Sequence, residues 1–140
     1  MLCDCHVYPT LAASDMARAR QFYEKVLGFE PAMVTPGGVM YDALSSRFFV
    51  YPTQFAGTNQ ATSLAFEVED LAKIVAELKG RGVRFEEYDM PGFKSKNGIV
   101  ETPDGPGAWI KDTEGNIIGI FQPTQKVEWP REKVAAGHHA

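Results

Sequence analysis

The sequence predicts an α+β fold in which two tandem βαβββ modules curve their sheets around a shared cleft. First, residues of one half recur in the other: Asp15 and Asp70 are 55 apart (70 − 15), and the Pro-Thr-Gln triplets beginning at Pro52 and Pro123 are 71 apart (123 − 52). Second, each half reads as a strand, a helix and three strands by its hydrophobic periodicity. Third, the polar residues 52–61 separate the halves. We expect one domain over residues 1–126, with module one at about 6–54, module two at about 61–125, and a polar tail at 127–140.

Module one begins with a predicted strand over residues 7–13. Ser14 and Asp15 are residue types that cap helix N-termini, and apolar residues follow at helical spacing over residues 16–27. Gly28 suits the left-handed conformation that ends many helices. Three strands are then predicted at residues 29–35, 39–43 and 47–51.

Module two repeats this order with a strand over residues 62–68 and a helix that begins after Glu69-Asp70. Gly80 and Gly82 end the helix. A strand over residues 83–88 and a turn over 89–92 follow. The next stretch, residues 93–106, is predicted to be irregular, and its glycine and proline content permits a mobile lid.

A β-hairpin closes module two by pairing residues 107–111 with residues 117–122. Its turn contains Asp112, Gly115 and Asn116, which bond their own backbone or tolerate positive φ. This role accounts for Asp112 and Asn116 without any chemistry. With helices on the outside, the inward faces of the strands would line the cleft where a ligand binds.

Composition narrows the class of function. The 140 residues are 44% hydrophobic and 23% charged, with a net charge of −4. That balance argues against nucleic acid as a partner, because no basic stripe is present. No apolar run approaches the roughly 20 residues of a membrane span, and no signal peptide is recognisable, so a cytoplasmic location is expected. Cys3 and Cys5 are expected to be free thiols, although a Cys3-Cys5-His6 metal clip is an alternative.

Three stretches together resemble a known superfamily: Ser14-Asp15-Met16 with Leu27-Gly28-Phe29, residues 65–71 (Ala-Phe-Glu-Val-Glu-Asp-Leu), and residues 111–116 (Lys-Asp-Thr-Glu-Gly-Asn). The chain resembles the vicinal oxygen chelate superfamily, which includes glyoxalase I, extradiol dioxygenases and bleomycin-binding proteins. The resemblance covers residues 6–123. It implies a glyoxalase-like fold and a homodimer, sometimes with exchanged modules and two clefts at the interface.

The same resemblance implies a divalent metal held by His, Glu or Gln from four strands. The corresponding positions here are Tyr8, Phe49, Ser63 and Gly119. Phe49 and Gly119 offer no donor atom, and Ser63 and Tyr8 are uncommon ligands. We therefore expect no metal and no cofactor.

Strand parity places aromatic side chains on the inward faces instead. Tyrosine hydroxyls there would orient a flat or apolar ligand, although the same rings also fit a closed, packed core. The expected ligand-binding residues are Tyr8, Tyr41, Phe49, Tyr51 and Trp109, with Ser63 and Gly119 leaving room on the opposite wall.

Three charged or titratable residues are weaker candidates. Glu67 shares a face with Ser63 and is the candidate catalytic base, with a solvated or helix-capping role as its alternative. His6 is a second possible base or a solvated residue, and Lys111 would meet an anionic ligand or form an ion pair.

The sequence thus predicts a metal-free protein that binds a small apolar or aromatic molecule in an aromatic-lined cleft. The alternative is a glyoxalase-like lyase or isomerase, or a dioxygenase, with a non-standard metal site or acid–base site. A third interpretation is a structural or regulatory dimer with a vestigial cleft. Whether the protein is an enzyme stays open at this point.

Overall fold

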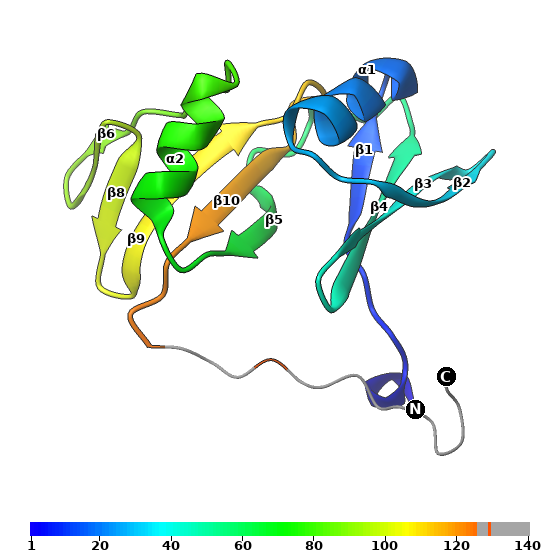
Figure 1. Cartoon of the computed structure of the whole chain (residues 1–140), viewed down its shortest axis with the longest axis horizontal. Coiled ribbons are helices and arrows are strands. Elements are labelled where there is room, and N and C mark those ends of the chain that lie inside the picture. The colour runs from blue at the N-terminus through cyan, green and yellow to red at the C-terminus, as the bar shows by residue number, and fades with distance from the viewer. Residues whose placement is uncertain (126–128, 130–140) are drawn as a thin grey trace.

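The computed structural model describes residues 1–125 and Trp129, and it confirms the two tandem modules. Each module contributes one sheet, in which the first strand runs parallel to the last (Figure 1). Sheet A has the strand order β1-β4-β3-β2, and sheet B has the order β5-β10-β9-β8-β7-β6. The strands of sheet A are β1 (Thr10–Ala13), β2 (Pro31–Thr35), β3 (Gly38–Ala43) and β4 (Ser46–Pro52). Those of sheet B are β5 (Thr62–Glu67), β6 (Asp89–Met90), β7 (Phe93–Lys96), β8 (Ile99–Thr102), β9 (Gly105–Lys111) and β10 (Ile117–Phe121).

The helices begin at the caps that the sequence indicates. Asp15 accepts a hydrogen bond from the Arg18 backbone N–H at 3.1 Å, and Asp70 does the same for Lys73 at 3.2 Å. Helix α1 (Met16–Arg20) continues as a π-helical segment, η2 (Gln21–Val26), whereas α2 (Leu71–Gly80) is α-helical throughout. A short 3₁₀ turn, η1 (Leu2–Asp4), precedes β1. No helix within the described part of the chain has the length and apolar character to cross a bilayer.

Two predictions about module two were wrong. Residues 83–88 form no strand and make only one bridge, between Phe85 and Ile110. Residues 93–106, expected to be irregular, contain β7, β8 and the start of β9. Asn97 and Gly98, with φ of 56° and 86°, form the two-residue turn between Lys96 and Ile99. Asn-Gly is the strongest short hairpin signal in a sequence, so this hairpin was readable.

One hydrophobic core joins the helix-covered sides of both sheets. Tyr23 of η2 stacks on Tyr41, which pairs with Phe48 across β3 and β4. Phe48 in turn contacts Phe66 of β5 at a ring-centroid distance of 6.3 Å, and Phe29 contacts Phe66 at 5.7 Å. The two modules therefore share a core through their helix-covered faces. The helices were expected to cover the outside of a cleft between the modules. Instead, the helix-covered faces of the two sheets form the shared core.

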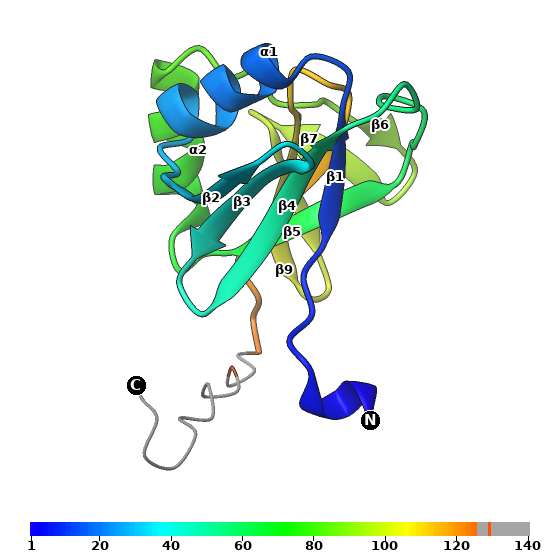
Figure 2. The same ribbon diagram turned by 90° about the vertical axis from the view of Figure 1, so that its right-hand side faces the viewer.

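The other face of each sheet is left uncovered by the helices, and we call it the open face. Figure 2 shows the strands of sheet A in front, with strands of sheet B behind them. Because cross-strand partners share a face, Phe49 lies on the open face of sheet A with its partners Thr10 and Met40. Trp109 and its partner Gly119 lie on the open face of sheet B.

Candidate functional site

The open face of sheet B carries a cluster of four half-buried aromatic rings, the module-two cluster. Trp109 is its hub, with ring-centroid distances of 5.2 Å to Phe121, 5.3 Å to Phe93 and 5.6 Å to Tyr88. The indole Nε1 of Trp109 also donates a hydrogen bond to Thr62 Oγ1 at 3.2 Å. The sequence predicted Trp109 but missed its three neighbours. Phe93 begins β7, in the stretch that was expected to be irregular, so the strand parity that placed Trp109 was not applied to it.

Two glycines lie beneath the Phe121 ring and allow it to rest against the sheet. A Cβ atom added at Gly119 would lie 2.6 Å from that ring, and one added at Gly107 would lie 2.8 Å from it. Gly119 was expected to leave room in the cleft, but the structure corrects this, since Phe121 covers it and the residue is buried.

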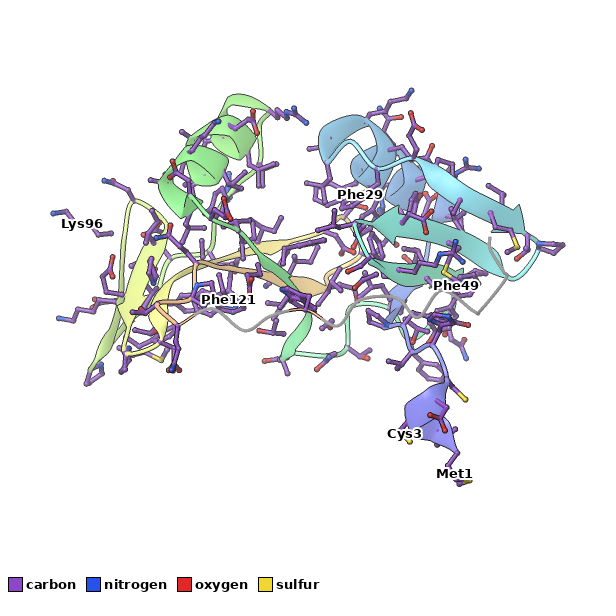
Figure 3. The ribbon with its side chains drawn as sticks, turned by 60° about the horizontal axis from the view of Figure 1, so that its bottom comes forward. Met1, Cys3, Phe29, Phe49, Lys96 and Phe121 are labelled. Carbon is purple, nitrogen blue, oxygen red and sulfur yellow. The ribbon has the colours of Figure 1, made fainter. Side chains whose placement is uncertain are left out.

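The open face of sheet A carries a second aromatic set, the module-one row, formed by Tyr8, Phe49 and Tyr51. Phe49 lies 6.3 Å from Tyr8 and is stacked at 6.5 Å with Tyr51. Tyr8 is 45% exposed. Phe49 rests over Gly38, where a Cβ atom would lie 2.6 Å from its ring. Figure 3 labels one member of each set, Phe49 and Phe121, over different sheets. The structure thus brings together three of the predicted ligand-binding residues.

Tyr41 does not belong to either set, which corrects the sequence prediction. It pairs with Phe48 rather than Phe49 across β3 and β4, so its ring points to the helix-covered side and is fully buried. Its hydroxyl donates a hydrogen bond to Glu24 Oε2 at 2.9 Å. Burial, followed by the contact with the Glu24 carboxylate, raises the pKa of Tyr41.

The remaining candidates lie at the margins of sheet B. Ser63 is half-buried near the start of β5, where its Oγ accepts a hydrogen bond from Asn59 Nδ2 at 3.1 Å. Glu67 is exposed at the end of β5 and accepts a hydrogen bond from Trp129 Nε1 at 3.2 Å. Lys111 pairs with Glu86 at 3.7 Å.

The positions that the resemblance assigns to metal ligands fall into two pairs on different sheets. Tyr8 lies beside Phe49 on sheet A, while Ser63 and Gly119 belong to sheet B. The side chains of Phe49 and Gly119 offer no donor atom, so these positions do not fit the metal that the resemblance implies. Within residues 1–125 and Trp129, no three His, Cys, Asp or Glu side chains are grouped so that they could hold an ion.

Two hollows lie near these elements. One, of about 400 Å³, is polar and is lined by His6, Tyr8, Asp42, Arg47 and their neighbours. The other, of about 350 Å³, lies where the modules meet, and we call it the intermodule groove. Its lining residues are Pro9, Phe29, residues 43–48, residues 64–67 and Trp129.

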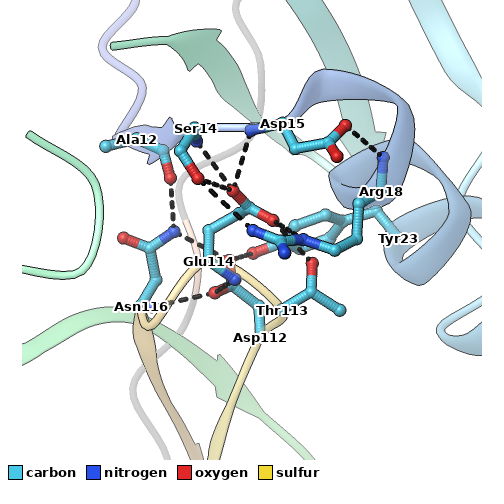
Figure 4. Close-up of polar contacts among 9 residues, drawn as sticks. All are labelled: Ala12, Ser14, Asp15, Arg18, Tyr23, Asp112, Thr113, Glu114 and Asn116. Carbon is cyan, nitrogen blue, oxygen red and sulfur yellow. Dashed lines mark hydrogen bonds and ion pairs between the residues drawn. The ribbon is translucent and has the colours of Figure 1, made fainter. Parts of the chain in front are cut away.

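The turn between β9 and β10 holds module two against module one through the Glu114 carboxylate. No sequence pattern had singled out Glu114. Glu114 is buried at the N-terminus of α1 (Figure 4). Its Oε1 accepts hydrogen bonds from Ser14 N at 2.7 Å and Asp15 N at 3.1 Å, and its Oε2 accepts one from Arg18 Nε at 2.8 Å. Burial alone would raise the pKa of Glu114, but these hydrogen bonds outweigh it and lower the pKa to about 2.

Asp112 and Asn116 also contact module one, in addition to their predicted role in the turn. Tyr23 donates a hydrogen bond to Asp112 Oδ2 at 2.7 Å, and Asn116 Nδ2 donates one to the Ala12 carbonyl at 2.8 Å. Burial and the Asp112 carboxylate raise the pKa of Tyr23. We call residues 112–116, with these contacts, the clasp. Because the clasp binds α1, β1 and η2, it fixes how the modules sit against each other.

Comparisons with known proteins agree with this architecture. Residues 6–120 match the family model of the Glyoxalase/Bleomycin resistance protein/Dioxygenase superfamily. No curated protein matches the sequence.

Several solved structures share the fold. The bleomycin resistance determinant encoded on transposon Tn5 superposes with a TM-score of 0.67 at 17% identity, covering 86% of this chain and 99% of that one. The bleomycin-binding protein of Streptomyces verticillus, complexed with copper(II)-bleomycin, gives 0.65 at 22% identity, covering 84% and 95%. Lactoylglutathione lyase from Agrobacterium tumefaciens gives 0.60 at 20% identity, covering 84% and 92%.

At these identities the structures establish the fold alone, and that fold hosts both binding proteins and an enzyme. The family model, in contrast, spans most of the sequence. The chain therefore belongs to the glyoxalase/bleomycin resistance protein/dioxygenase superfamily.

Proposed function

We propose that this protein is a metal-free, homodimeric binding protein for a small apolar or aromatic molecule. The ligand lies between the module-one row of one chain and the module-two cluster of the other. Binding needs no chemical step, so capture of the ligand is the whole mechanism. The same proposal places the protein in the cytoplasm, a compartment that keeps exposed thiols such as Cys3 and Cys5 reduced.

The proposal rests on one observation: the shared core separates the module-one row from the module-two cluster within one chain. Among the described residues, no ring contact joins the row of Tyr8, Phe49 and Tyr51 to the cluster around Trp109. The core that contains Phe48 and Phe66 joins the helix-covered faces of the two sheets. One chain therefore presents two half-sites, and a second copy supplies the missing half of each.

The chemistry of the half-sites supports an aromatic ligand. Flat rings on both walls favour stacking, and the hydroxyls of Tyr8, Tyr51 and Tyr88 provide polar groups that orient a ligand. Relatives of the same fold are named for binding bleomycin, which supports capture of a drug-like molecule over turnover.

Tryptophan fluorescence tests the proposal, because Trp109 sits at the hub of one half-site. Trp129→Phe leaves Trp109 as the only tryptophan, and Trp109→Phe is the matched control that keeps Trp129. Titration with bleomycin and a panel of planar aromatic compounds should quench Trp109 with saturation, and a bound ligand should raise the melting temperature. No saturable quenching and no thermal shift with any compound would contradict the proposal.

Two further measurements address the parts of the proposal that do not involve the ligand. Sedimentation equilibrium should give the mass of two chains at micromolar concentration. Elemental analysis of protein purified without added metal salts should find far less than one equivalent of transition metal per chain. One equivalent of transition metal per chain that survives dialysis would favour the enzyme alternative over the binding protein.

A further inference from the structure

The intermodule groove is separate from both aromatic half-sites. Its apolar walls are Phe29 and Phe48 from module one and Leu64 and Phe66 from module two. None of the rings of the module-one row or of the module-two cluster lines it. Its volume of about 350 Å³ falls at the lower end of the range for small-molecule sites, roughly 300–1,000 Å³.

Trp129 is one of the residues that line this groove. It is eight residues past the end of β10 (129 − 121). Its indole Nε1 donates a hydrogen bond to Glu67 Oε2 at 3.2 Å, and the residue stays 61% exposed. The groove therefore already holds one aromatic ring with an N–H donor.

The charges at the rim define which molecules fit. Glu67 is the only carboxylate that lines the groove, and within the described residues it has no cationic partner. Arg47 also lines the groove, but its guanidinium is paired with Asp42. The uncompensated charge is therefore negative, which favours donors and cations and disfavours carboxylates.

We propose that the intermodule groove is a second binding site, for a small aromatic molecule that carries an ammonium or N–H donor, and that the Trp129 side chain is its built-in competitor. The ring packs on Phe29, Phe48, Leu64 and Phe66, and the donor binds Glu67. This site does not depend on dimerisation or on the module-one row. A ligand enters by displacing the indole, so the apparent affinity is reduced by the fraction of time that Trp129 leaves the groove open.

Two probes with the same ring and polar groups of opposite charge test the chemistry. Phenethylamine and phenylacetate carry the same ring with an ammonium or a carboxylate, and neither interferes with tryptophan emission. Calorimetry should detect phenethylamine binding, and phenylacetate should bind at least about tenfold more weakly. Equal affinities for the two probes would overturn the assignment of Glu67 as the recognition group.

Two variants test the built-in competitor and the carboxylate. If Trp129 covers the groove nine-tenths of the time, Trp129→Ala should tighten phenethylamine binding about tenfold. Glu67→Gln should weaken it about tenfold in the Trp129→Ala background, because it removes the charge and keeps the shape. Both side chains are exposed, so the melting temperature should not move. Unchanged affinity in either variant would overturn the proposal.

Displacement can be observed directly in Trp109→Phe, whose only tryptophan is Trp129. Phenethylamine should shift Trp129 emission to the red as the indole moves into water. In Trp129→Phe the same probe should leave Trp109 emission unchanged, which separates this site from the proposed cleft. A response of Trp109 alone would assign the probe to the module-two cluster and remove the second site.

Discussion

Module one and module two share a strand order, yet aromatic rings cover their open faces to different degrees. In module two the β6–β7 hairpin adds Phe93 beside Trp109, and Val100, opposite Gly107, is completely buried. Within the described residues sheet A has four strands and no counterpart of that hairpin, and Tyr8 at the end of its row is 45% exposed. The comparison indicates that the rings of module two pack against one another as a preformed wall, whereas those of module one leave Tyr8 exposed.

The largest expected effect comes from breaking the clasp, on which both modules depend. Glu114→Ala removes the acceptor for two backbone N–H groups and for Arg18. The loss should be about 3–4 kcal/mol in the free energy of unfolding, because a buried carboxylate that accepts several hydrogen bonds is removed and two partly buried backbone N–H groups lose their acceptor. Urea unfolding measures it. Asp15→Asn is the control, because an Asn side chain retains the helix cap and should cost under about 0.5 kcal/mol.

The pH dependence of stability should report the same carboxylate. The pKa of Glu114 is lowered in the folded protein from 4.5 to about 2. Its contribution is therefore fully present above pH 4.5 and is lost as the pH falls towards 2. This shift corresponds to about 3 kcal/mol. The stability difference between wild type and Glu114→Gln should shrink over this window, and a constant difference from pH 6 to pH 2.5 would show that Glu114 is not the group responsible.

A smaller effect is expected where the Phe121 ring rests on glycine. Gly119→Ala places a Cβ atom 2.6 Å from that ring, which must shift, so unfolding free energy should fall by about 1–3 kcal/mol. Gly80→Ala is the matched control: a Cβ there meets nothing within 4 Å, and the residue ends α2. It should be neutral or stabilise by up to about 1 kcal/mol. Similar losses for both would argue against a packed module-two cluster.

The smallest effects should separate the two aromatic sets. Phe93→Ala should cost about 1–2 kcal/mol and shift Trp109 emission to the red, because the ring contacts Trp109 at 5.3 Å. Tyr51→Ala should cost less than about 1 kcal/mol in monomeric protein, since within the described residues its ring contacts only that of Phe49. If Tyr51→Ala were the more costly substitution under dilute conditions, module one would not be the more open face.

The sequence was informative about local structure. The helix caps at Asp15 and Asp70 and the closing hairpin follow from residues near one another in the chain, where local rules apply. The module repeat follows from comparing the sequence with itself and needs no tertiary contact. The β7–β8 hairpin was equally readable from Asn97-Gly98, but strand periodicity alone does not reveal it in this stretch.

The site was harder to derive because it depends on register and on contacts between modules. The sequence prediction placed Tyr41 on the wrong face of sheet A because the assumed register was off by one residue. Such a shift exchanges the two faces of a strand. Glu114 lies in a turn, and no local pattern links it to Ser14, a hundred residues away. The groove likewise joins Phe48 to Phe66 through tertiary packing alone.

Subunit complementation tests the central claim most directly. One variant carries Phe49→Ala and Tyr51→Ala, and the other carries Trp109→Ala, so each alone has only damaged clefts and should not bind a ligand of the wild-type cleft. After the two are refolded together, random pairing gives one intact cleft in half of the dimers, so about a quarter of the wild-type binding capacity should return. No recovery, with heterodimers verified by native mass spectrometry, would mean that each site lies within one chain and would contradict the claim.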